Sequence, residues 1–236
     1  MGRLIYLSPM SLDGYLAEEG GDLDWSVPSE EVLGCFNDLI RPVGTHLYGR
    51  KMYETMAYWE TPPTGSSSVE LEFGELWRDA DKVVYSTTLP AISSARTRIE
   101  RAFDVEAIRA LKASADRDIT IGGPHLAAHA IRAGIVDDYQ LVVMPATLGG
   151  GNRVLPAGVR LDLELVDERR FENGTVHLHY RPSPYSITMS TEACATVLPS
   201  FGLSKCASTR AGPAGAVAGI VRVTSHAPGI PMSGAL

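Results

Sequence analysis

The chain has 236 residues, of which 44% are hydrophobic, and a formal net charge of −7. This hydrophobic fraction supports a buried core and excludes a wholly disordered protein, and the length suits one domain plus an additional segment. The acidic balance, with no long basic run, argues against nucleic acid as the main partner.

Strand and helix patterns alternate along the first 182 residues. We expect, in chain order, strands at 3–8, 45–48, 82–86, 118–121 and 139–144, and helices at 29–40, 50–58, 69–78, 104–113 and 124–133. Ser29 is the expected cap of the first helix. The intervening segment at 9–28 reads as an unusually long loop, which is typical of a functional loop. The fold class predicted from this alternation is α/β with a mixed sheet.

Two last strands, at 161–171 and 175–181, flank the sequence Glu172-Asn173-Gly174. Asn-Gly between apolar runs is a strong hairpin signal. The sheet should therefore end in an antiparallel hairpin.

The composition changes near residue 182. Beyond it, the last 54 residues carry only four charged side chains and are rich in Ser, Ala, Gly, Thr and Pro. Such a segment buries too little apolar surface to offset its ordering entropy. We therefore predict a folded domain at 1–182 and a disordered low-complexity tail at 183–236.

Other sequence features bear on location and metals. The chain starts directly in a strand-like run, with no signal-peptide pattern, and no apolar stretch reaches the ~20 residues of a membrane span. Its three cysteines form no CxxC pair and no zinc-like cluster. We expect a cytoplasmic protein with no membrane partner, no disulfide framework and no metal site.

Two strand-to-helix turns are suited to phosphate. In the first, Gly49 precedes Arg50 and Lys51 at a helix start; in the second, Gly122 and Gly123 precede a proline at the first helical position. Glycine lets a ligand approach the backbone closely, and unpaired amides at a helix start attract anions. Either turn alone is a weak signal, but together they favour a nucleotide cofactor.

The combination of these segments resembles the dihydrofolate reductase-like superfamily, and within it the reductase domain of the riboflavin-synthesis protein RibD, standing alone. The resemblance spans almost all of residues 1–182 and rests on the stretches at 10–17, 24–25, 47–54, 86–89, 121–124, 134–139 and 144–151. It implies a dihydrofolate reductase-like central mixed sheet flanked by helices. It also implies an NADPH-dependent reductase of a small heterocyclic or carbonyl substrate, acting as a homodimer.

The resemblance assigns cofactor contacts to specific positions. Gly49, Arg50 and Lys51 would face one cofactor phosphate, and Gly122 and Gly123 would lie under the nicotinamide and pyrophosphate. The hydroxyl groups of the adenosine end, which could bond a ribose 2′-phosphate, would come from Ser86, Thr87 and Thr88.

Two departures bear on the substrate. RibD reductase domains typically carry an acidic residue just before the paired glycines, where this chain has Ile121. The deaminase motifs of the bifunctional protein are also absent from the sequence. Both weaken the case for an aminouracil phosphate, and the substrate stays open among aminouracil, pterin and other small molecules.

Catalysis would rest mainly on positioning the cofactor, with one acid assisting proton transfer. The candidate acids are Asp13, Asp24 and Glu30, and Trp25 is a candidate substrate contact beside the cleft. Each has a plain structural alternative: Asp13 could shape a turn, Asp24 could be a surface acid, and Glu30 could complement the helix dipole. A non-catalytic nucleotide-binding protein on the same fold is the rival hypothesis, and a membrane-associating tail is a third.

Overall fold

The computed structural model describes residues 1–21, 23–61 and 64–183. The predicted tail at 183–236 lies outside these residues except for Ser183. The strands are β1 (Leu4–Ser11), β2 (Tyr15–Ala17), β3 (Val43–Gly49), β4 (Asp81–Tyr85), β5 (Thr97–Glu100), β6 (Asp118–Gly122), β7 (Asp138–Met144), β8 (Asn152–Arg153), β9 (Leu163–Arg170) and β10 (Val176–Pro182). The helices are α1 (Glu30–Ile40), α2 (Arg50–Met56), α3 (Ser68–Asp79), α4 (Val105–Ser114) and α5 (Pro124–Arg132), with single-turn 3-10 helices η1 (Asp24–Ser26) and η2 (Ala57–Glu60).

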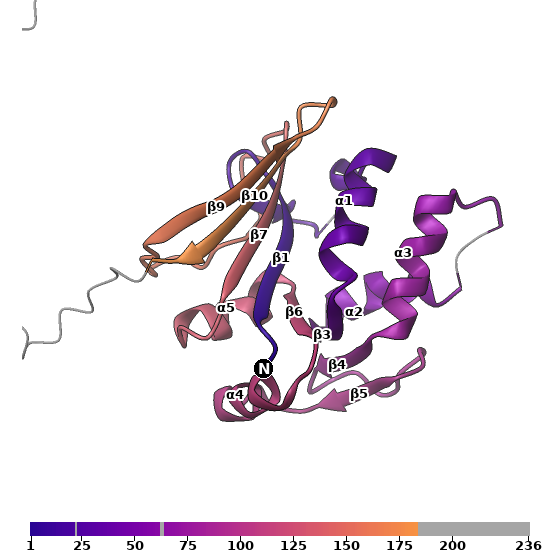
Figure 1. Ribbon diagram of the computed structural model, residues 1–236, viewed down its shortest axis with the longest axis vertical. Coiled ribbons are helices and arrows are strands. Elements are labelled where there is room, and N and C mark those ends of the chain that lie inside the picture. Colours follow the sequence, from indigo (N-terminus) through magenta and orange to yellow (C-terminus); the bar gives the residue numbers. More distant parts are fainter. Residues whose placement is uncertain (22, 62–63, 184–236) are drawn as a thin grey trace, which may run out of the picture. The chain divides into compact units, whose positions relative to one another are not determined.

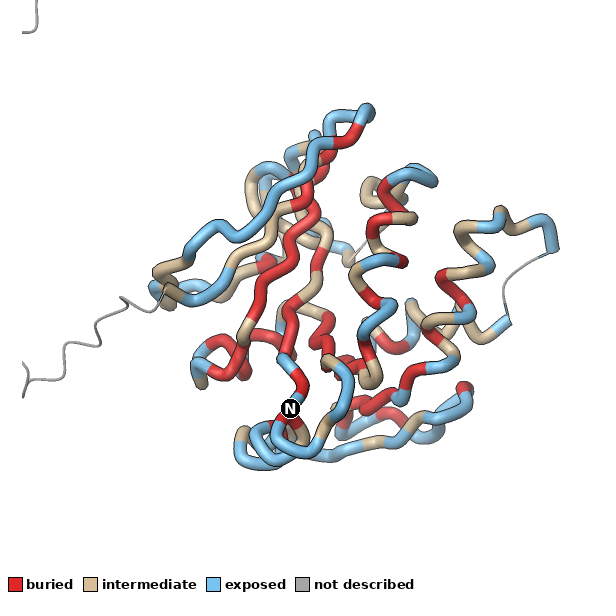
Figure 2. Tube along the Cα trace, viewed as in Figure 1, coloured by how far each residue is buried: buried red, intermediate tan, exposed pale blue. Residues whose placement is uncertain are grey.

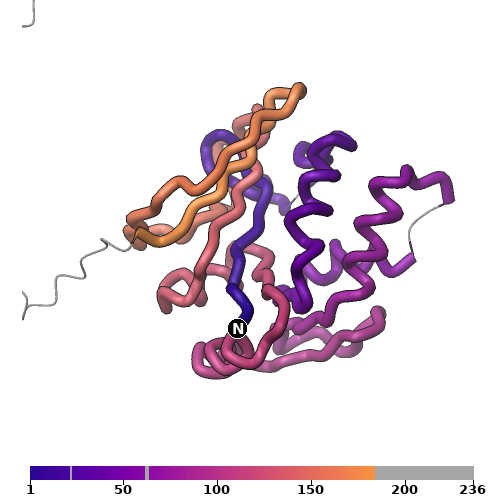
Figure 3. The backbone as a smooth tube through the Cα atoms, in the orientation of Figure 1, coloured from indigo at the N-terminus to yellow at the C-terminus, as the bar shows by residue number. Residues whose placement is uncertain are grey.

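Eight of the strands form one mixed sheet in the order β5-β4-β3-β6-β1-β7-β10-β9. The six strands from β5 to β7 run parallel to their neighbours, whereas β10 pairs antiparallel with both β7 and β9. Figure 3 follows the chain from indigo β1 to the orange hairpin of β9 and β10 at the end of the described residues. The short strands β2 and β8 form a separate antiparallel pair.

The two faces of the sheet bury different residues of the same strands. On one face Leu47, Val83 and Ile119 belong to the main core, which also holds Leu126 and Ile131 of α5. The residues next to them in sequence, such as Tyr48 and Val84, pack instead with Tyr53 and Trp77. This alternation is the period of two that a strand imposes on its side chains. In Figure 1, α1 and α3 stand together on one side of the sheet, away from α4 and α5.

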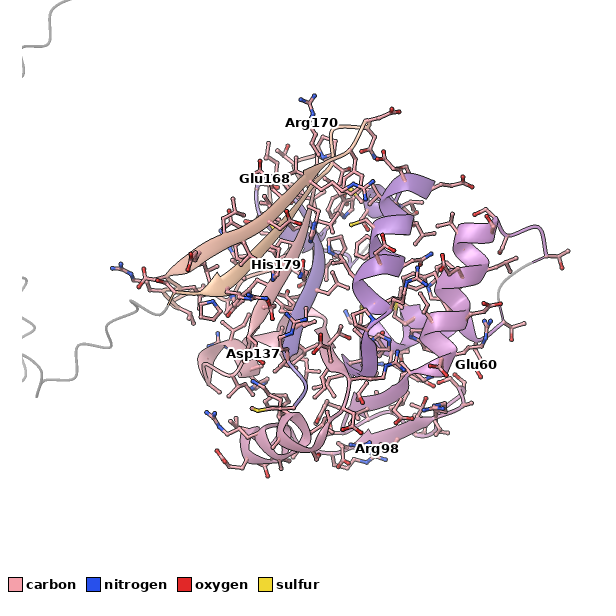
Figure 4. All side chains as sticks on the ribbon, in the orientation of Figure 1. Glu60, Arg98, Asp137, Glu168, Arg170 and His179 are labelled. Carbon is pink, nitrogen blue, oxygen red and sulfur yellow. The ribbon has the colours of Figure 1, made fainter. Side chains whose placement is uncertain are left out.

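The buried carboxylate of Asp138, the first residue of β7, connects β7 to β10 and to the chain just before β1. The side chain of Asp138 is 1% exposed and accepts bonds from Arg181 Nε at 2.8 Å and Arg3 Nη1 at 3.4 Å, while His179 Nε2 lies 2.5 Å from it. Burial alone would raise the pKa of Asp138, but the bonds from His179 and Arg181 outweigh it and hold the pKa below its usual value. Figure 4 shows His179 on β10, from which it reaches β7.

The predicted α/β fold with a mixed sheet and a closing hairpin is confirmed. The Ser29 cap is also confirmed, because its hydroxyl accepts a bond from Val32 N at 3.4 Å. The prediction of a long loop at 9–28 is wrong in part, because β1 continues to Ser11, and β2 and η1 lie within the predicted loop. The predicted helix at 50–58 ends at Met56 and continues as η2.

Three strands, β2, β5 and β8, are not predicted by the sequence patterns. In Figure 2 the central strands are mostly buried, whereas β9 is largely exposed along its length. No helix among residues 1–21, 23–61 and 64–183 has the length and hydropathy needed to cross a bilayer.

Candidate active site

A cavity of about 490 Å³ lies where β3, β4 and β6 end and α2 and α5 begin. We call it the polar cavity because its lining includes the charged side chains of Arg50, Lys51 and Arg101 together with three consecutive hydroxyl residues, Ser86, Thr87 and Thr88. Carboxyl ends of neighbouring parallel strands are where ligands bind in open α/β sheets.

The hydroxyl loop after β4 is held in place by hydrogen bonds at its base. Ser86 Oγ accepts bonds from the backbone amides of Thr88 at 3.2 Å and Leu89 at 2.9 Å. From the other side, Arg101 Nη1 donates to the carbonyl oxygens of Ser86 at 2.9 Å and Leu89 at 3.1 Å. The loop is therefore preorganised, with Thr87 and Thr88 on the cavity lining.

Aromatic rings form another part of the polar cavity. Phe103 stands 5.3 Å from Tyr85, centroid to centroid, and stacks on His129 at 5.5 Å with an interplanar angle of 30°. All three residues line the cavity. Flat rings of this kind can stack on a planar base, while the nearby cations suit a phosphate.

The turn before α5 requires glycine. Gly123 has a φ of +87°, in the left-handed region that side chains rarely adopt, and a Cβ added there would lie 3.4 Å from Met52 Cβ. Pro124 then occupies the start of α5. Since Gly123 lines the polar cavity, its bare backbone can approach a ligand closely.

A second cavity, of about 280 Å³, lies beside the first. We call it the apolar cavity because its lining includes Leu33, Phe36 and Ile40 of α1, Trp59 of η2 and Phe73 of α3. The two cavities share three lining residues, Leu23, Met52 and Thr55.

The boundary between the cavities runs along the ends of two adjacent parallel strands. At β3, Tyr48 lines the apolar cavity and Gly49 the polar one; at β6, Gly122 lines the apolar cavity and Gly123 the polar one. A molecule in the polar cavity and another in the apolar cavity would therefore meet at these strand ends.

His46 and Thr120 form a buried polar pair on the lining of the apolar cavity. They are opposite each other on β3 and β6, and His46 Nδ1 lies 2.6 Å from Thr120 Oγ1. The ring of Tyr48 stacks on that of His46 at 5.5 Å. Burial, with the positive charges of Lys82 and Arg117, lowers the pKa of His46 to about 3. The imidazole is therefore neutral at physiological pH.

The structure brings most of the predicted cofactor residues together. Those on the polar cavity are Gly49, Arg50, Lys51, Ser86, Thr87, Thr88 and Gly123; Gly122 lines the apolar cavity. In the described part of the chain, the remaining four predicted site residues line neither cavity: Asp13, Trp25, Asp24 and Glu30. Their proposed roles stay predictions.

Sequence reasoning did not assign several residues of the polar cavity, among them Arg101, Phe103 and His129. Arg101 and Phe103 follow β5, a strand the patterns did not predict. His129 lies one turn after His125 on α5, and both line the cavity. That spacing is visible in the sequence and could have placed His129 beside the second phosphate turn.

Asp13 joins two loops rather than entering a cavity. Its carboxylate accepts bonds from Ser11 Oγ at 2.6 Å and from the backbone amides of Leu148 at 3.1 Å and Gly149 at 2.7 Å. The bond from Ser11, followed by those from Leu148 and Gly149, lowers the pKa of Asp13 from 3.8 to about 2, against the effect of desolvation. Asp13 thus ties the turn after β1 to the segment between β7 and β8.

We expect Asp13→Asn to loosen this connection. An amide replaces one acceptor oxygen by a donor, so the bonds to the Leu148 and Gly149 amides cannot both persist. Hydrogen exchange at these two amides should accelerate at least about tenfold. Because the folded pKa is depressed, the carboxylate's contribution is complete above about pH 4 and is lost as pH falls through about 2.

At neutral pH, the exchange rates of these two amides should therefore be higher in the variant than in the parent. The rates should become similar only in strong acid, where Asp13 of the parent is protonated. Asp116→Asn, at an exposed position before β6, is the matched control. Unchanged exchange at Leu148 and Gly149 in Asp13→Asn would contradict the loop-joining role.

The family model of the RibD C-terminal domain matches residues 3–177. The chain belongs to the RibD C-terminal domain family. Within the curated proteins, this member is 28% identical over 180 residues to the uncharacterized protein YyaP of Bacillus subtilis, a match that covers 75% of this chain and 94% of that protein.

Solved structures show the same dihydrofolate reductase-like fold for this RibD C-terminal domain. A putative riboflavin biosynthesis protein from Shewanella is 18% identical, with a TM-score of 0.58 over 78% of this chain and 99% of its own. Dihydrofolate reductase from Enterococcus faecalis, in complex with NADP(H), is 18% identical with a TM-score of 0.54, over 77% and 96%. The deaminase and 5-amino-6-(5-phosphoribosylamino)uracil reductase of Thermotoga maritima is 15% identical with a TM-score of 0.56, over 77% and 57%.

Proposed function

We propose that this protein is an NADPH-dependent reductase of a small heterocyclic or carbonyl substrate. The observation that carries the proposal is the meeting of two unlike cavities at Leu23, Met52 and Thr55. One cavity has the cations and hydroxyls that a phosphorylated cofactor needs, and the other is apolar. Membership of the RibD C-terminal domain family supports a reductase, as do the reductases among its structural neighbours.

The polar cavity has the size of an ordinary ligand site and the side-chain chemistry that a dinucleotide needs. Its volume of about 490 Å³ lies within the ~300–1,000 Å³ of ordinary ligand sites. Arg50 and Lys51 would hold one phosphate, the hydroxyl loop and Arg101 would hold the adenosine end, and the backbone at Gly123 would face the pyrophosphate. Phe103 and His129 offer a stacking wall to the adenine.

When bound, NADPH supplies a hydride, and hence two electrons, to an electrophilic carbon of the acceptor, whose oxygen or nitrogen takes up a proton. The residues shared by both cavities hold the acceptor against the cofactor and exclude water from the contact. Asp24 or Glu30, which line neither cavity, would supply that proton.

Calorimetric titration of the full chain with NADPH and NADH tests the cofactor, and NADPH oxidation in the presence of ketones, aldehydes and pterins tests the reaction. Binding selective for NADPH with turnover of at least one acceptor is the expected result. Selective binding with no turnover across the panel would favour the rival, a non-catalytic nucleotide-binding protein. No binding of either nucleotide would refute the proposal.

Arg50→Ala should weaken NADPH binding by about 1–3 kcal/mol, which is typical for the loss of charge-assisted hydrogen bonds. The Arg50 side chain is 46% exposed, and its only ion-pair partner among the described residues is Glu54, at 3.4 Å. Its guanidinium can therefore turn toward a ligand at little cost. Little change in stability should accompany the loss.

Arg98→Ala is the control for Arg50→Ala. Arg98 lies on β5 (Figure 4), is similarly exposed and pairs with Glu100, but it does not line the polar cavity. It should leave the NADPH dissociation constant unchanged. Equal NADPH dissociation constants for Arg50→Ala and the parent would show that Arg50 does not contact the cofactor.

A further inference from the structure

The residue types on the lining of the apolar cavity determine which ligands it can hold. None of its described lining residues is Lys, Arg, Asp or Glu. Transferring a phosphate or carboxylate into such a site carries a large desolvation cost with no ion pair to offset it. An anionic group placed in this cavity is therefore disfavoured.

The wall of the cavity also offers few hydrogen-bonding groups to a polar heterocycle, chiefly the hydroxyls of Ser26, Tyr48, Thr55 and Thr120, because most of its lining residues are hydrophobic. Ile121, at the position before the paired glycines, is wholly buried and lines the cavity, so no carboxylate faces a ligand from there. A ring bearing several donors and acceptors would leave most of them unpaired. Each donor or acceptor that is buried without a partner lowers the affinity, so the cost to such a ring grows with the number of its polar groups.

Two lining residues have a buried ring nitrogen with no hydrogen-bond partner among the described residues, Trp77 at Nε1 and His46 at Nε2, and of the two only the imidazole nitrogen can act as either donor or acceptor. His46 is 3% exposed and lines the cavity, its Nδ1 is paired with Thr120, and its Nε2 has no hydrogen-bond partner among the described residues. Buried polar nitrogens are nearly always satisfied. Because the imidazole is neutral, Nε2 suits one neutral polar atom of a ligand rather than an anion.

The volume sets the size of the occupant. About 280 Å³ equals the volume of about nine waters, enough for a compact molecule of one or two rings. Aromatic side chains such as Phe36, Trp59 and Phe73 on the lining suit a flat ring.

We infer that the apolar cavity takes an uncharged, mainly apolar one- or two-ring substrate with a single carbonyl or similar polar atom, which pairs with His46 Nε2. A phosphorylated pyrimidine is excluded from it. The inference rests on the proposed function, because the substrate must lie against a cofactor in the polar cavity.

The first test compares ligands that share a naphthalene ring and differ in charge. Calorimetry on the full chain without cofactor would measure 2-acetylnaphthalene, 2-naphthoate and 2-naphthyl phosphate. The neutral ketone should bind at least tenfold more tightly than either anion. Equal or tighter binding of the phosphate, or no binding of the ketone, would overturn the inferred substrate class.

A rim substitution locates the binding site. Val27 lines the apolar cavity and is 75% exposed, so Val27→Lys should fold normally. It should tighten binding of 2-naphthyl phosphate at least threefold and leave the NADPH dissociation constant unaltered. Val166→Lys, on exposed β9, is the matched control and should change neither. If Val27→Lys affects none of the three ligands, they bind elsewhere and the inference fails.

The role of His46 is tested with an isostere. In 2-isopropenylnaphthalene a methylene group replaces the ketone oxygen, so the parent protein should prefer 2-acetylnaphthalene at least fivefold, and His46→Phe should abolish that preference. If His46→Phe does not fold, the comparison of the two compounds on the parent protein is sufficient. Equal affinity of the parent for both compounds would overturn the pairing with Nε2. NADPH is titrated in a separate experiment. If NADPH fails to bind, the proposed function is refuted, but the affinities of the naphthalene ligands still test the inferred specificity of the apolar cavity.

Discussion

Gly123→Asp should raise the NADPH dissociation constant at least about 100-fold, or about 2.7 kcal/mol. The turn at Gly123 lies on the polar cavity, where its backbone would face the cofactor pyrophosphate. A carboxylate there would oppose the phosphates at close range in a partly desolvated site. Calorimetric titration of the full chain with NADPH measures the effect.

The same position carries backbone strain, which the control must separate from charge. Gly123 has a φ of +87°, so any side chain is strained there. Gly123→Ala bears that strain and the same Cβ contact with Met52, but no charge. It should bind NADPH much more tightly than Gly123→Asp, and the gap should narrow at high salt. Equal dissociation constants for the two variants would show that strain, not charge, is responsible.

Regular elements of this fold were predictable because their periodicity is strong. Strands such as β6, with Ile119 and Ile121 in the main core, and helices such as α1, capped by Ser29, carry their signal within a few residues. Three of the four residues in the β5 sequence Thr97-Arg98-Ile99-Glu100 are polar, and they alternate between intermediate and exposed because β5 is an edge strand. Its pairing with β4, rather than its own composition, makes it a strand.

The site was predictable where one short segment supplies several groups. Arg50 and Lys51 follow Gly49 directly, and Ser86, Thr87 and Thr88 are consecutive, so each set reaches the polar cavity as a unit. The cavity as a whole depends on contacts between segments that are distant in the sequence, and local sequence patterns do not predict such contacts.

The acids show this limit most clearly. The Asp-Gly sequence at position 13 suggested either a turn or catalysis, and its partners at Leu148 and Gly149 are more than 130 residues away. Similarly, Ile121 was recognised as a departure from the family pattern, but only the fold places it on a cavity without a charged residue among those described.

Gly151→Ala should disrupt the pairing of β2 with β8 and thereby open one side of the polar cavity. Gly151 has a φ of +115°, and a Cβ there would overlap the carbonyl oxygen of Ala17. Ala17 pairs with Asn152, and both line the polar cavity. We expect a loss of about 1–3 kcal/mol in the free energy of unfolding, as for other overpacked sites, and a NADPH dissociation constant raised about tenfold.

Gly158→Ala separates the overlap at Gly151 from backbone strain. Gly158 also has a positive φ, +74°, but a Cβ added there meets nothing within 4 Å. Its strain should therefore cost stability without changing NADPH affinity, because position 158 does not line the cavity. Chemical denaturation gives the stability of each variant and calorimetry its affinity. If Gly151→Ala lost stability but kept full NADPH affinity, the β2–β8 pair would be a structural element only, and the polar cavity would not need it to hold the cofactor.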